Sequence, residues 1–406
     1  MSLKINAISL CVLCVLVTFT SSHIIEIPFY SDNNNTSTQY TSPSSSSSVH
    51  TRFLSPNLNF GNGDEIAIEQ TTADRIVVDL CFGSQRTCIK AKLSTSYPYV
   101  WVAHQNVCSN GFDPSLSSSF EQTDSTLSIP ELYGYVKGNI CTDKVYLSSY
   151  RVSNFPFLLT NSEFNYKEYQ GALGLGYQYE DTKYSYIDRL SKAQELDSKV
   201  FFIKYNNNRQ DGVIGLGGYP RELKTMNKKY ELKTCKVIST KIENGNEVPN
   251  NRWECKLDSI YYTTQNGDNE LMKIDSKVNF SLGSNINSFP IEVFNEFINK
   301  YMKRYIDSGE CRIDSMKYLD VVFCNIYFEY EKLGDVNYVI GKWSLKFKAK
   351  DLFSQFNEGL RFGIYGHKGK KEEFILGYYL FKKYVVVFDK YEDVVGVMRN
   401  TNYDDE

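Results

Sequence analysis

The pattern that most constrains the fold of this chain is a strand that runs into a tight turn of small residues, and it occurs twice. The two copies are Leu93-Ser94-Thr95-Ser96-Tyr97 and Phe280-Ser281-Leu282-Gly283-Ser284. Each copy is followed much later by an apolar segment rich in glycine, Gly171 to Gly176 and Phe374 to Gly377, and glycine lets two backbones approach closely. Ordinary turns would also contain such glycines, but the repeated order indicates two halves of similar structure.

The composition favours an all-β protein large enough for two lobes. The chain has 406 residues with 31 Tyr and 25 Phe, and aromatic side chains suit half-buried strands. Short strands separated by turns follow from Arg75 onward, and the best helical pattern is Ile291 to Ile306, which Pro290 precedes. A net charge of −3 gives no electrostatic reason to expect nucleic acid or an anionic membrane as a partner.

The N-terminus has the pattern of a secretory signal peptide over residues 1–22. Lys4 supplies a positive charge, Ile5 to Phe19 is mostly apolar, and small residues follow at Thr20 to Ser22. A signal anchor is the alternative, but the apolar run is short for a bilayer. No second apolar run follows, so we expect a protein that is secreted or held in the lumen of the secretory pathway, without a membrane span after signal removal.

Residues 23–71 have a low-complexity composition that predicts disorder, because they contain three consecutive asparagines and a serine run. Asn34 and Asn35 lie in glycosylation sequons and are candidates for modification. An inhibitory propeptide is the alternative reading, although only Arg52 offers it a basic residue. Residues 401–406 form an acidic tail.

The eight cysteines of the mature chain predict disulfides rather than a metal site. Three pairs flank likely turns, and we expect each to close its hairpin, which leaves Cys108 for Cys141. The expected pairs are Cys81–Cys88, Cys235–Cys255, Cys311–Cys324 and Cys108–Cys141. Sequence cannot prove this connectivity among 105 possible pairings. The cysteine spacing does not resemble a zinc site and the four histidines are scattered, so no metal or cofactor is expected.

Six motifs in a collinear order resemble those of the pepsin-like aspartic proteases, over roughly residues 72 to 400. They are Phe112 to Phe120 after the first turn, a flap hairpin from Leu127 through Gly134, Gly138 and Asp143, the glycine segment Gly171 to Gly176, the crossing Gly212 to Gly218, the strand Trp253 to Ile260, and Phe374 to Gly377 with Val385 to Asp389. The resemblance implies an all-β, bilobal fold with a central cleft and a few short helices, with lobes at 72–226 and 227–400.

The resemblance also implies an aspartate at the start of each small-residue turn, where this chain has Ser94 and Ser281. The family's reaction needs two carboxylates that share a proton, and a serine hydroxyl cannot replace either as a base near neutral pH. A serine nucleophile would need a base beside it, and nothing places His104 there. Glu131 and Asp275 are the evident acids that could substitute, but neither matches a catalytic slot.

Other departures surround these two positions. The first turn keeps Thr95 but has Ser96 where the family has glycine, and the second keeps Gly283 but has Leu282 where the family has threonine. Those threonines normally link the two turns by hydrogen bonds. In the flap, gap-free counting puts Glu131 where the family has tyrosine, and a small shift would bring Tyr133 there instead. Asn279 begins a sequon, but it lies on a strand that we expect to be buried, so we expect this asparagine to be unmodified.

We therefore expect a secreted pseudoprotease, a monomer, that binds peptide, protein or glycan through its cleft or surface. The cleft and flap candidates are Thr95, Ser96, Trp101, Glu131, Tyr133, Leu282, Gly283 and Ser284. Trp101 has an alternative reading as a core residue. Two other functions stay open: an active aspartic-type endopeptidase with displaced or unusual catalytic residues, and a structural or surface-coat protein. The sequence does not identify the ligand.

Overall fold

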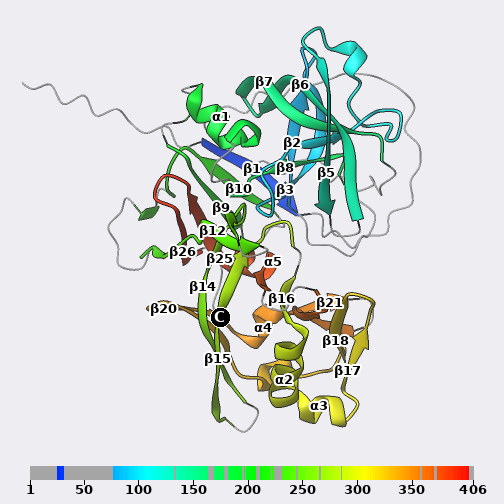
Figure 1. The fold of residues 1–406 in the computed structure, drawn as a ribbon. Coiled ribbons are helices and arrows are strands. Elements are labelled where there is room, and N and C mark those ends of the chain that lie inside the picture. Colours follow the sequence, from blue (N-terminus) through cyan, green and yellow to red (C-terminus); the bar gives the residue numbers. More distant parts are fainter. Residues whose placement is uncertain are drawn as a thin grey trace, which may run out of the picture.

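The computed structural model describes most of the chain from residue 76 onward and one strand before it. The described residues are 25–31, 76–131, 134–162, 169–177, 182–193, 196, 198–206, 211–220, 222–223, 231–243, 246–264, 267–284, 286–356, 359–369 and 373–401. They form two β-rich lobes, one above the other in Figure 1, with the C-terminal hairpin between them. This is the all-β, bilobal fold that the sequence predicts. Within the described ranges, none of the helices has the length and apolar run needed to cross a bilayer.

The first lobe is built on a sheet of 13 strands, of which the lobe itself supplies ten. Its strands in chain order are β1 (Ile25–Ser31), β2 (Ile76–Phe82), β3 (Thr87–Ser94), β4 (Trp101–Ala103), β5 (Glu121–Glu131), β6 (Gly134–Leu147), β7 (Tyr150–Thr160), β8 (Gly171–Gly174), β9 (Val200–Asn206) and β10 (Asp211–Leu216). Its helices are η1 (Pro114–Leu116), η2 (Thr182–Tyr184) and α1 (Tyr186–Lys192). Because β2 pairs with β6 as well as with β1 and β3, the sheet folds back on itself around an apolar core.

Strand β1 corrects one prediction from the sequence. It lies in the segment 23–71 that was expected to be disordered, yet it pairs antiparallel with β10 from Ile25↔Leu216 to Tyr30↔Asp211 and also reaches β2. The seven residues Ile25–Ser31 are mostly apolar or aromatic, a composition that suits a strand. The expectation was therefore wrong for these residues, while 32–71, with Asn34 and Asn35, lies outside the described residues, as do the signal segment 1–22 and most of the acidic tail.

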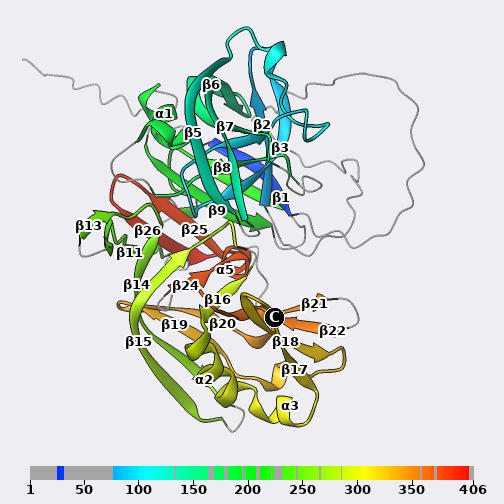
Figure 2. The ribbon, with the colours of Figure 1, turned by 45° about the vertical axis from the view of Figure 1, so that its right-hand side comes forward.

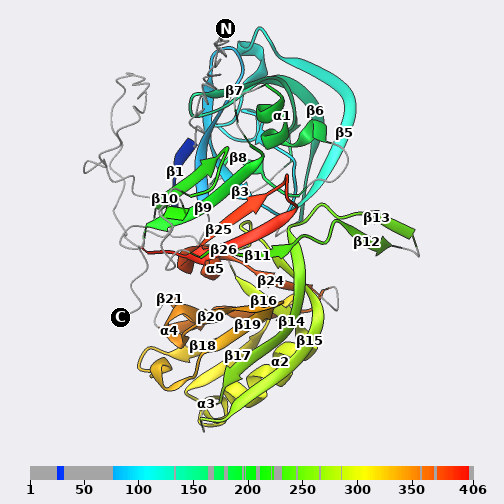
Figure 3. The same ribbon diagram turned by 90° about the vertical axis from the view of Figure 1, so that its left-hand side faces the viewer.

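The second lobe is built on a sheet of 11 strands, with a small separate hairpin that projects from it in Figure 3. The strands are β14 (Glu254–Thr263), β15 (Asn269–Phe280), β16 (Asn287–Pro290), β17 (Cys311–Ser315), β18 (Leu319–Asn325), β19 (Val336–Ile340), β20 (Trp343–Phe347), β21 (Phe353–Phe356), β22 (Gly359–Phe362), β23 (Ile364–His367) and β24 (Glu373–Leu376). The hairpin is β12 (Thr240–Glu243) with β13 (Asn246–Pro249). The helices are α2 (Ile291–Tyr301), α3 (Lys303–Asp307), η5 (Tyr330–Lys332), α4 (Ala349–Leu352) and α5 (Tyr378–Lys383).

The predicted helix is present after Pro290 and is divided in two. Met302, with φ −129° and ψ 4°, separates α2 from α3. The apolar residues that the pattern placed on one face are all buried, and they are Phe294, Phe297, Ile298, Tyr301 and Tyr305. A helix that buries one such face is stabilised mainly by its packing against the sheet.

Strands from the C-terminal part of the chain return to the first sheet and form a base shared by the lobes. Strands β11 (Lys233–Lys236), β25 (Tyr384–Asp389) and β26 (Val394–Arg399) continue that sheet beyond β9. Trp253, which precedes β14, is buried against Phe201 and Phe388 from this base, and its Nε1 donates to Leu175 O at 2.8 Å. Packing of large aromatic rings therefore joins the second lobe to the base.

The base also contains a group of charged side chains, which consists of Asp188, Lys199 and Lys390. Asp188 on α1 is fully buried and pairs with Lys390, which follows β25 and is 10% exposed. Lys199 Nζ lies 3.0 Å from the other Asp188 oxygen. The helix and the C-terminal hairpin, 202 residues apart, thus meet at a buried ion pair, and removing one partner of such a pair is strongly destabilising.

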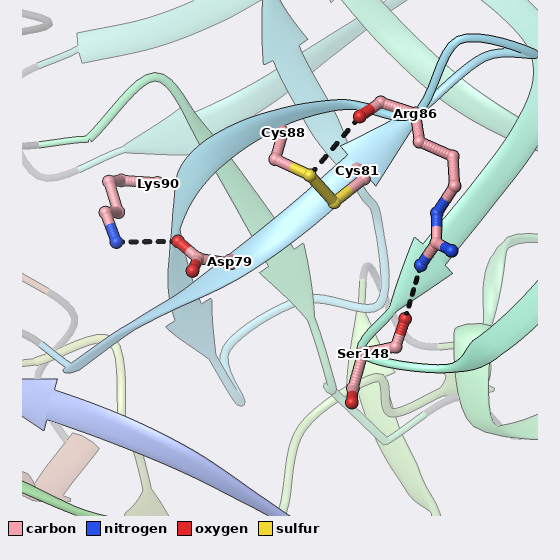
Figure 4. Close-up of a disulfide and its surroundings, with 6 residues drawn as sticks. All are labelled: Asp79, Cys81, Arg86, Cys88, Lys90 and Ser148. Atoms are coloured by element: carbon pink, nitrogen blue, oxygen red, sulfur yellow. Dashed lines mark hydrogen bonds and ion pairs between the residues drawn. A yellow bond between two sulfur atoms is a disulfide. The ribbon is translucent and has the colours of Figure 1, made fainter. Parts of the chain in front are cut away.

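Three of the four expected disulfides are present. They are Cys81–Cys88, Cys235–Cys255 and Cys311–Cys324. Figure 4 shows the first, which joins β2 to β3 beside the Lys90–Asp79 ion pair, with the oppositely charged atoms 2.6 Å apart. The expectation that each bridge closes its own hairpin is confirmed for β2–β3 and β17–β18. It was wrong for Cys235–Cys255, which joins β11 of the first sheet to β14 of the second.

The fourth expected disulfide was wrong, because Cys108 and Cys141 are free thiols. Cys141 on β6 belongs to the core enclosed by the first sheet, while Cys108 packs against a second cluster around Trp101 on the opposite face. Pairing by elimination ignored which face of the sheet each side chain occupies. Burial raises the pKa of the Cys141 thiol to about 11, so it stays protonated and unreactive at neutral pH.

Candidate functional site

The two small-residue turns meet at one place between the lobes, which we call the floor. It consists of Ser94, the last residue of β3, with Thr95 and Ser96, and of Ser281 to Ser284 after β15. The hydroxyl oxygens of Ser96 and Ser281 lie 2.7 Å apart and share a hydrogen bond across the lobes. A Cβ added to Gly283 would lie 2.8 Å from Ser94 Oγ, so the glycine lets the second turn pack directly on the first.

Thr95 makes the second link between the turns. Its Oγ1 donates to Phe280 O at 2.7 Å and accepts from Leu282 N, also at 2.7 Å. The equivalent position in the second turn is Leu282, which is buried and has no hydroxyl to return these bonds. The half of the cross-link that Thr95 makes is therefore present, and the half expected from a threonine at position 282 is missing.

Each turn is supported from behind by the glycine segment of its own lobe. Strand β3 pairs in parallel with β8 up to Ser94↔Gly174, and β15 pairs in parallel with β24 up to Phe280↔Leu376. Close backbone approach requires glycine on both sides, since a Cβ on Gly174 would lie 2.2 Å from Tyr99 O and one on Gly377 would lie 2.1 Å from Ile286 O. The repeated order seen in the sequence is thus a repeated structure, with one copy in each lobe.

The floor is uncharged in the described part of the chain. Ser94 and Ser281 are almost fully buried. Ser94 Oγ accepts a hydrogen bond within its own turn, from Ser96 N at 3.3 Å. Ser281 Oγ shares a hydrogen bond with the opposite turn, at Ser96 Oγ. Ser284 Oγ donates to Ile286 O at 3.0 Å. Hydroxyls both donate and accept, so such a floor can bind neutral polar groups but has no carboxylate in these contacts to accept a proton.

The acids and the histidine that the sequence offered as alternative catalytic groups are not part of the floor as far as the structure describes them. The Asp275 side chain is 81% exposed and its Oδ1 lies 2.8 Å from Lys256 Nζ, which holds the pKa of this carboxyl below its usual range. His104 lies in the loop after β4, where its Nδ1 accepts from Asn106 N at 3.0 Å. Neither group reaches the hydroxyls of the floor. The side chain of Glu131, at the end of β5, is not among the described ones.

The flap is a hairpin of β5 and β6, as the resemblance implies, and the predicted flap residue Tyr133 lies outside the described residues. Trp101 is fully buried under this hairpin, among Ile129, Val136 and Leu158, and its Nε1 donates to Tyr97 Oη at 3.3 Å. Trp101 is therefore a core residue, the alternative that the sequence left open. Asn279 is 3% exposed on β15, as expected.

Of the predicted cleft residues, the structure brings Thr95, Ser96, Leu282, Gly283 and Ser284 together with Ser94 and Ser281. The sequence did not predict that Ser96, rather than Ser94, would face Ser281. The signal was visible as Ser96 in place of the family's glycine, since a side chain added at this point must project towards the opposite turn.

Comparisons with known proteins agree with this architecture. Residues 77–399 match the family model described as eukaryotic aspartyl protease. The chain is 25% identical to pregnancy-associated glycoprotein 1 of Sus scrofa over 343 residues, which cover 79% of each chain. It is 34% identical to chymosin of Callithrix jacchus over 112 residues, 26% of this chain and 29% of that protein.

Proposed function

Because this chain belongs to the eukaryotic aspartyl protease family, we propose that it is a secreted, non-catalytic member that holds an extended peptide, protein segment or glycan in its cleft without cutting it. The single observation that carries the proposal is the contact between Ser96 Oγ and Ser281 Oγ, 2.7 Å apart. The two turns come as close as a proton-sharing acid pair would need, and the groups that meet are hydroxyls.

The reaction of the family depends on two carboxylates in hydrogen-bond reach of each other. Their mutual repulsion raises one pKa, so one acid donates to the scissile carbonyl while the other takes a proton from water. The positions that the resemblance assigns to these acids are Ser94 and Ser281. A serine hydroxyl there has no neighbouring base among the described residues, so neither water activation nor a serine nucleophile is supported.

Binding is supported by the same geometry. Ser96, Gly283 and Ser284 are only half-buried, so they present a hydroxyl-rich surface at the bottom of the site. Extended polypeptides and sugars bind through polar groups that need both donors and acceptors, which hydroxyls and nearby backbone supply. The flap hairpin β5–β6 gives a second surface to close over such a ligand, with Tyr133, which follows β5 in the sequence, as the candidate contact.

Export is supported by independent features of the chain. The signal-like N-terminus and three disulfides are typical of proteins that fold in an oxidising compartment. An endopeptidase with displaced acids is disfavoured by the exposed position of Asp275. A structural or surface-coat role would leave the cleft without a ligand, and the following experiment distinguishes it.

The test incubates the mature protein with a pool of peptides from a denatured protein and measures, by equilibrium dialysis and mass spectrometry, which peptides are retained intact. A matched oligosaccharide pool is the second probe. We expect retention of intact ligands by the wild type, and at least about tenfold weaker retention by Ser96→Phe, which fills the floor, and by Tyr133→Ala at the flap.

The matched control is Ser344→Phe, which adds the same ring at an exposed position on β20, and it should bind as the wild type does. Thermal melting must show that Ser96→Phe remains folded. Absence of any retained ligand, or equal retention by all variants, would remove the support for a cleft-based function and favour the structural role.

A further inference from the structure

Strand β17 forms an edge of the second lobe's sheet. It pairs antiparallel with β18 from Cys311↔Cys324 to Ser315↔Asp320, and no strand among the described residues pairs with its other side. Figure 2 shows this hairpin at the margin of the lower lobe, beside α3. An open edge offers a row of backbone donors and acceptors that can pair with another strand.

The backbone groups on that open side can be identified. Asn325 N donates to Glu310 O at 2.9 Å and Met316 N donates to Leu319 O at 2.8 Å, so hydrogen-bonded pairs flank β17 at both ends. Cys311 and Cys324, directly opposite each other and next to the first of these, are therefore a non-hydrogen-bonded pair of the antiparallel ladder. Because such pairs alternate with hydrogen-bonded ones, Arg312 and Asp314 use their backbone groups on β18. The N–H and C=O groups of Cys311, Ile313 and Ser315 therefore point away from β18.

This row of groups matches a second copy of itself. If two β17 strands meet antiparallel about a twofold axis at Ile313, then Cys311 lies opposite Ser315, and Ile313 lies opposite its own counterpart. All three positions have their backbone groups on the open side, so the ladder is complete over the five residues of the strand. An interface of this kind, with the same surface on both subunits, is the usual form of a symmetric dimer.

The side chains in this register are complementary in charge. Arg312 of one copy lies opposite Asp314 of the other, twice by symmetry. Both are accessible, with exposed fractions of 74% and 39%, and within one chain Arg312 Nε already lies 3.0 Å from Asp314 Oδ1. Pairing would thus form a group of four alternating charges on one face of the sheet, and opposite charges on facing strands are stabilising.

The other face and the flanks also fit. Ile313, 38% exposed, would cover its counterpart on the opposite face from the charges. Beyond the strand, the same register places Met316, 52% exposed, opposite Glu310 of the second copy, and Lys317 opposite Gly309. A Cβ built on Gly309 meets nothing within 4 Å, so this flank has room for the incoming turn, and Lys317 would lie near the Glu310 carboxylate.

We infer that the chain forms a weak, symmetric homodimer by antiparallel pairing of β17 with β17 of a second copy, in the register centred on Ile313. The inference departs from the monomer expected from the sequence. The strand is short, so the dimer is expected to dissociate on dilution rather than to be permanent.

Charge-swap variants test both the dimer and its register. Arg312→Asp alone places Asp opposite Asp, and Asp314→Arg alone places Arg opposite Arg. Sedimentation equilibrium over a concentration series should show reversible association of the wild type, weakened about tenfold or more in either single variant. An equimolar mixture of the two single variants should associate again, because each Asp then faces an Arg, and so should the double variant Arg312→Asp/Asp314→Arg.

Thermal melting checks that the variants fold, which is expected because both side chains are exposed. A wild type that stays monomeric to its solubility limit would overturn the inference. Single variants that associate as the wild type does would also overturn it, and a mixture that stays monomeric would exclude this register.

Discussion

The lobes are joined at two regions that differ in chemistry, the floor and the base. At the floor, Thr95, Ser96 and Ser281 make hydrogen bonds between neutral hydroxyls and backbone groups. At the base, Asp188 and Lys390 form a buried ion pair beside the aromatic packing of Trp253. The contacts between the two turns are neutral, and the charged contact lies in the structural base.

The floor and the base should respond differently to pH. A floor of hydroxyls does not change its charge between acid and neutral pH, so its contacts should be insensitive to pH. The base contains a buried carboxylate whose charge is needed by its lysine partners. The protein should therefore lose stability in acid through its base, while its floor stays the same.

The largest expected effect comes from removing the charge of the base. Asp188→Asn leaves Lys390 in a buried site without its partner, and breaking such a pair costs about 3 kcal/mol or more. Chemical denaturation at neutral pH would measure the loss. The control is Asp79→Asn, because Asp79 is 63% exposed and its ion pair with Lys90 contributes little. Equal effects of the two variants would contradict the account of the base.

The pH dependence of stability sharpens the same contrast. Burial alone would raise the pKa of Asp188, but the charge of Lys390 and hydrogen bonds from Lys390, Ser185 and Lys199 outweigh it and hold that pKa below its ordinary value of 3.8. A lowered folded-state pKa contributes stability above the unfolded value, and this is lost as pH falls through the folded value. Below about pH 4, wild-type stability should therefore fall more steeply than that of Asp188→Asn. If the free energies of unfolding of the two proteins fell equally with pH, the Asp188 carboxylate would not be the source of the acid sensitivity.

At the floor, Thr95→Val should have the largest effect. The substitution keeps the shape but removes the oxygen that bonds both Phe280 O and Leu282 N, which are left unsatisfied at a cost of about 2 kcal/mol or more. Thr95→Ser keeps the oxygen and should lose less. If valine and serine were equally tolerated, the one-directional link between the turns would not contribute to stability.

The smallest expected effect is that of the hydroxyl pair. Ser96→Ala should cost about 1 kcal/mol, and Ser281→Ala a similar amount. Because the two hydroxyls bond to each other, the double variant should lose less than the sum of the single losses. Strict additivity in this double-mutant cycle would show that the contact is not made in solution.

The features that the sequence predicted well depend on short stretches of chain. The turns at Ser94 and Ser281 and the glycine segments behind them could be recognised because strand, turn and glycine follow in a local order. Two of the three disulfides, Cys81–Cys88 and Cys311–Cys324, close local hairpins in the same way. The helix after Pro290 was visible from the spacing of its buried residues.

The features that the sequence missed depend on which face a side chain occupies or on distant partners. Cys108 and Cys141 lie on opposite faces of a sheet, which elimination could not reveal. Strand β1 is a seven-residue run beside low-complexity sequence, and its partner β10 lies far along the chain. The pair of Asp188 and Lys390 has no local pattern at all, since each residue appears as an ordinary surface charge.

A proteolysis assay tests our proposal that the floor cannot perform the acid chemistry of the family. Purified mature protein is incubated with a denatured, alkylated protein from pH 3 to 7, and new termini are detected by mass spectrometry with and without a transition-state mimic of the family. The account predicts that no cleavage occurs above that of the substrate alone. Cleavage by the wild type that the mimic blocks would contradict it, and loss of that cleavage in Ser94→Ala or Ser281→Ala would place it at the floor.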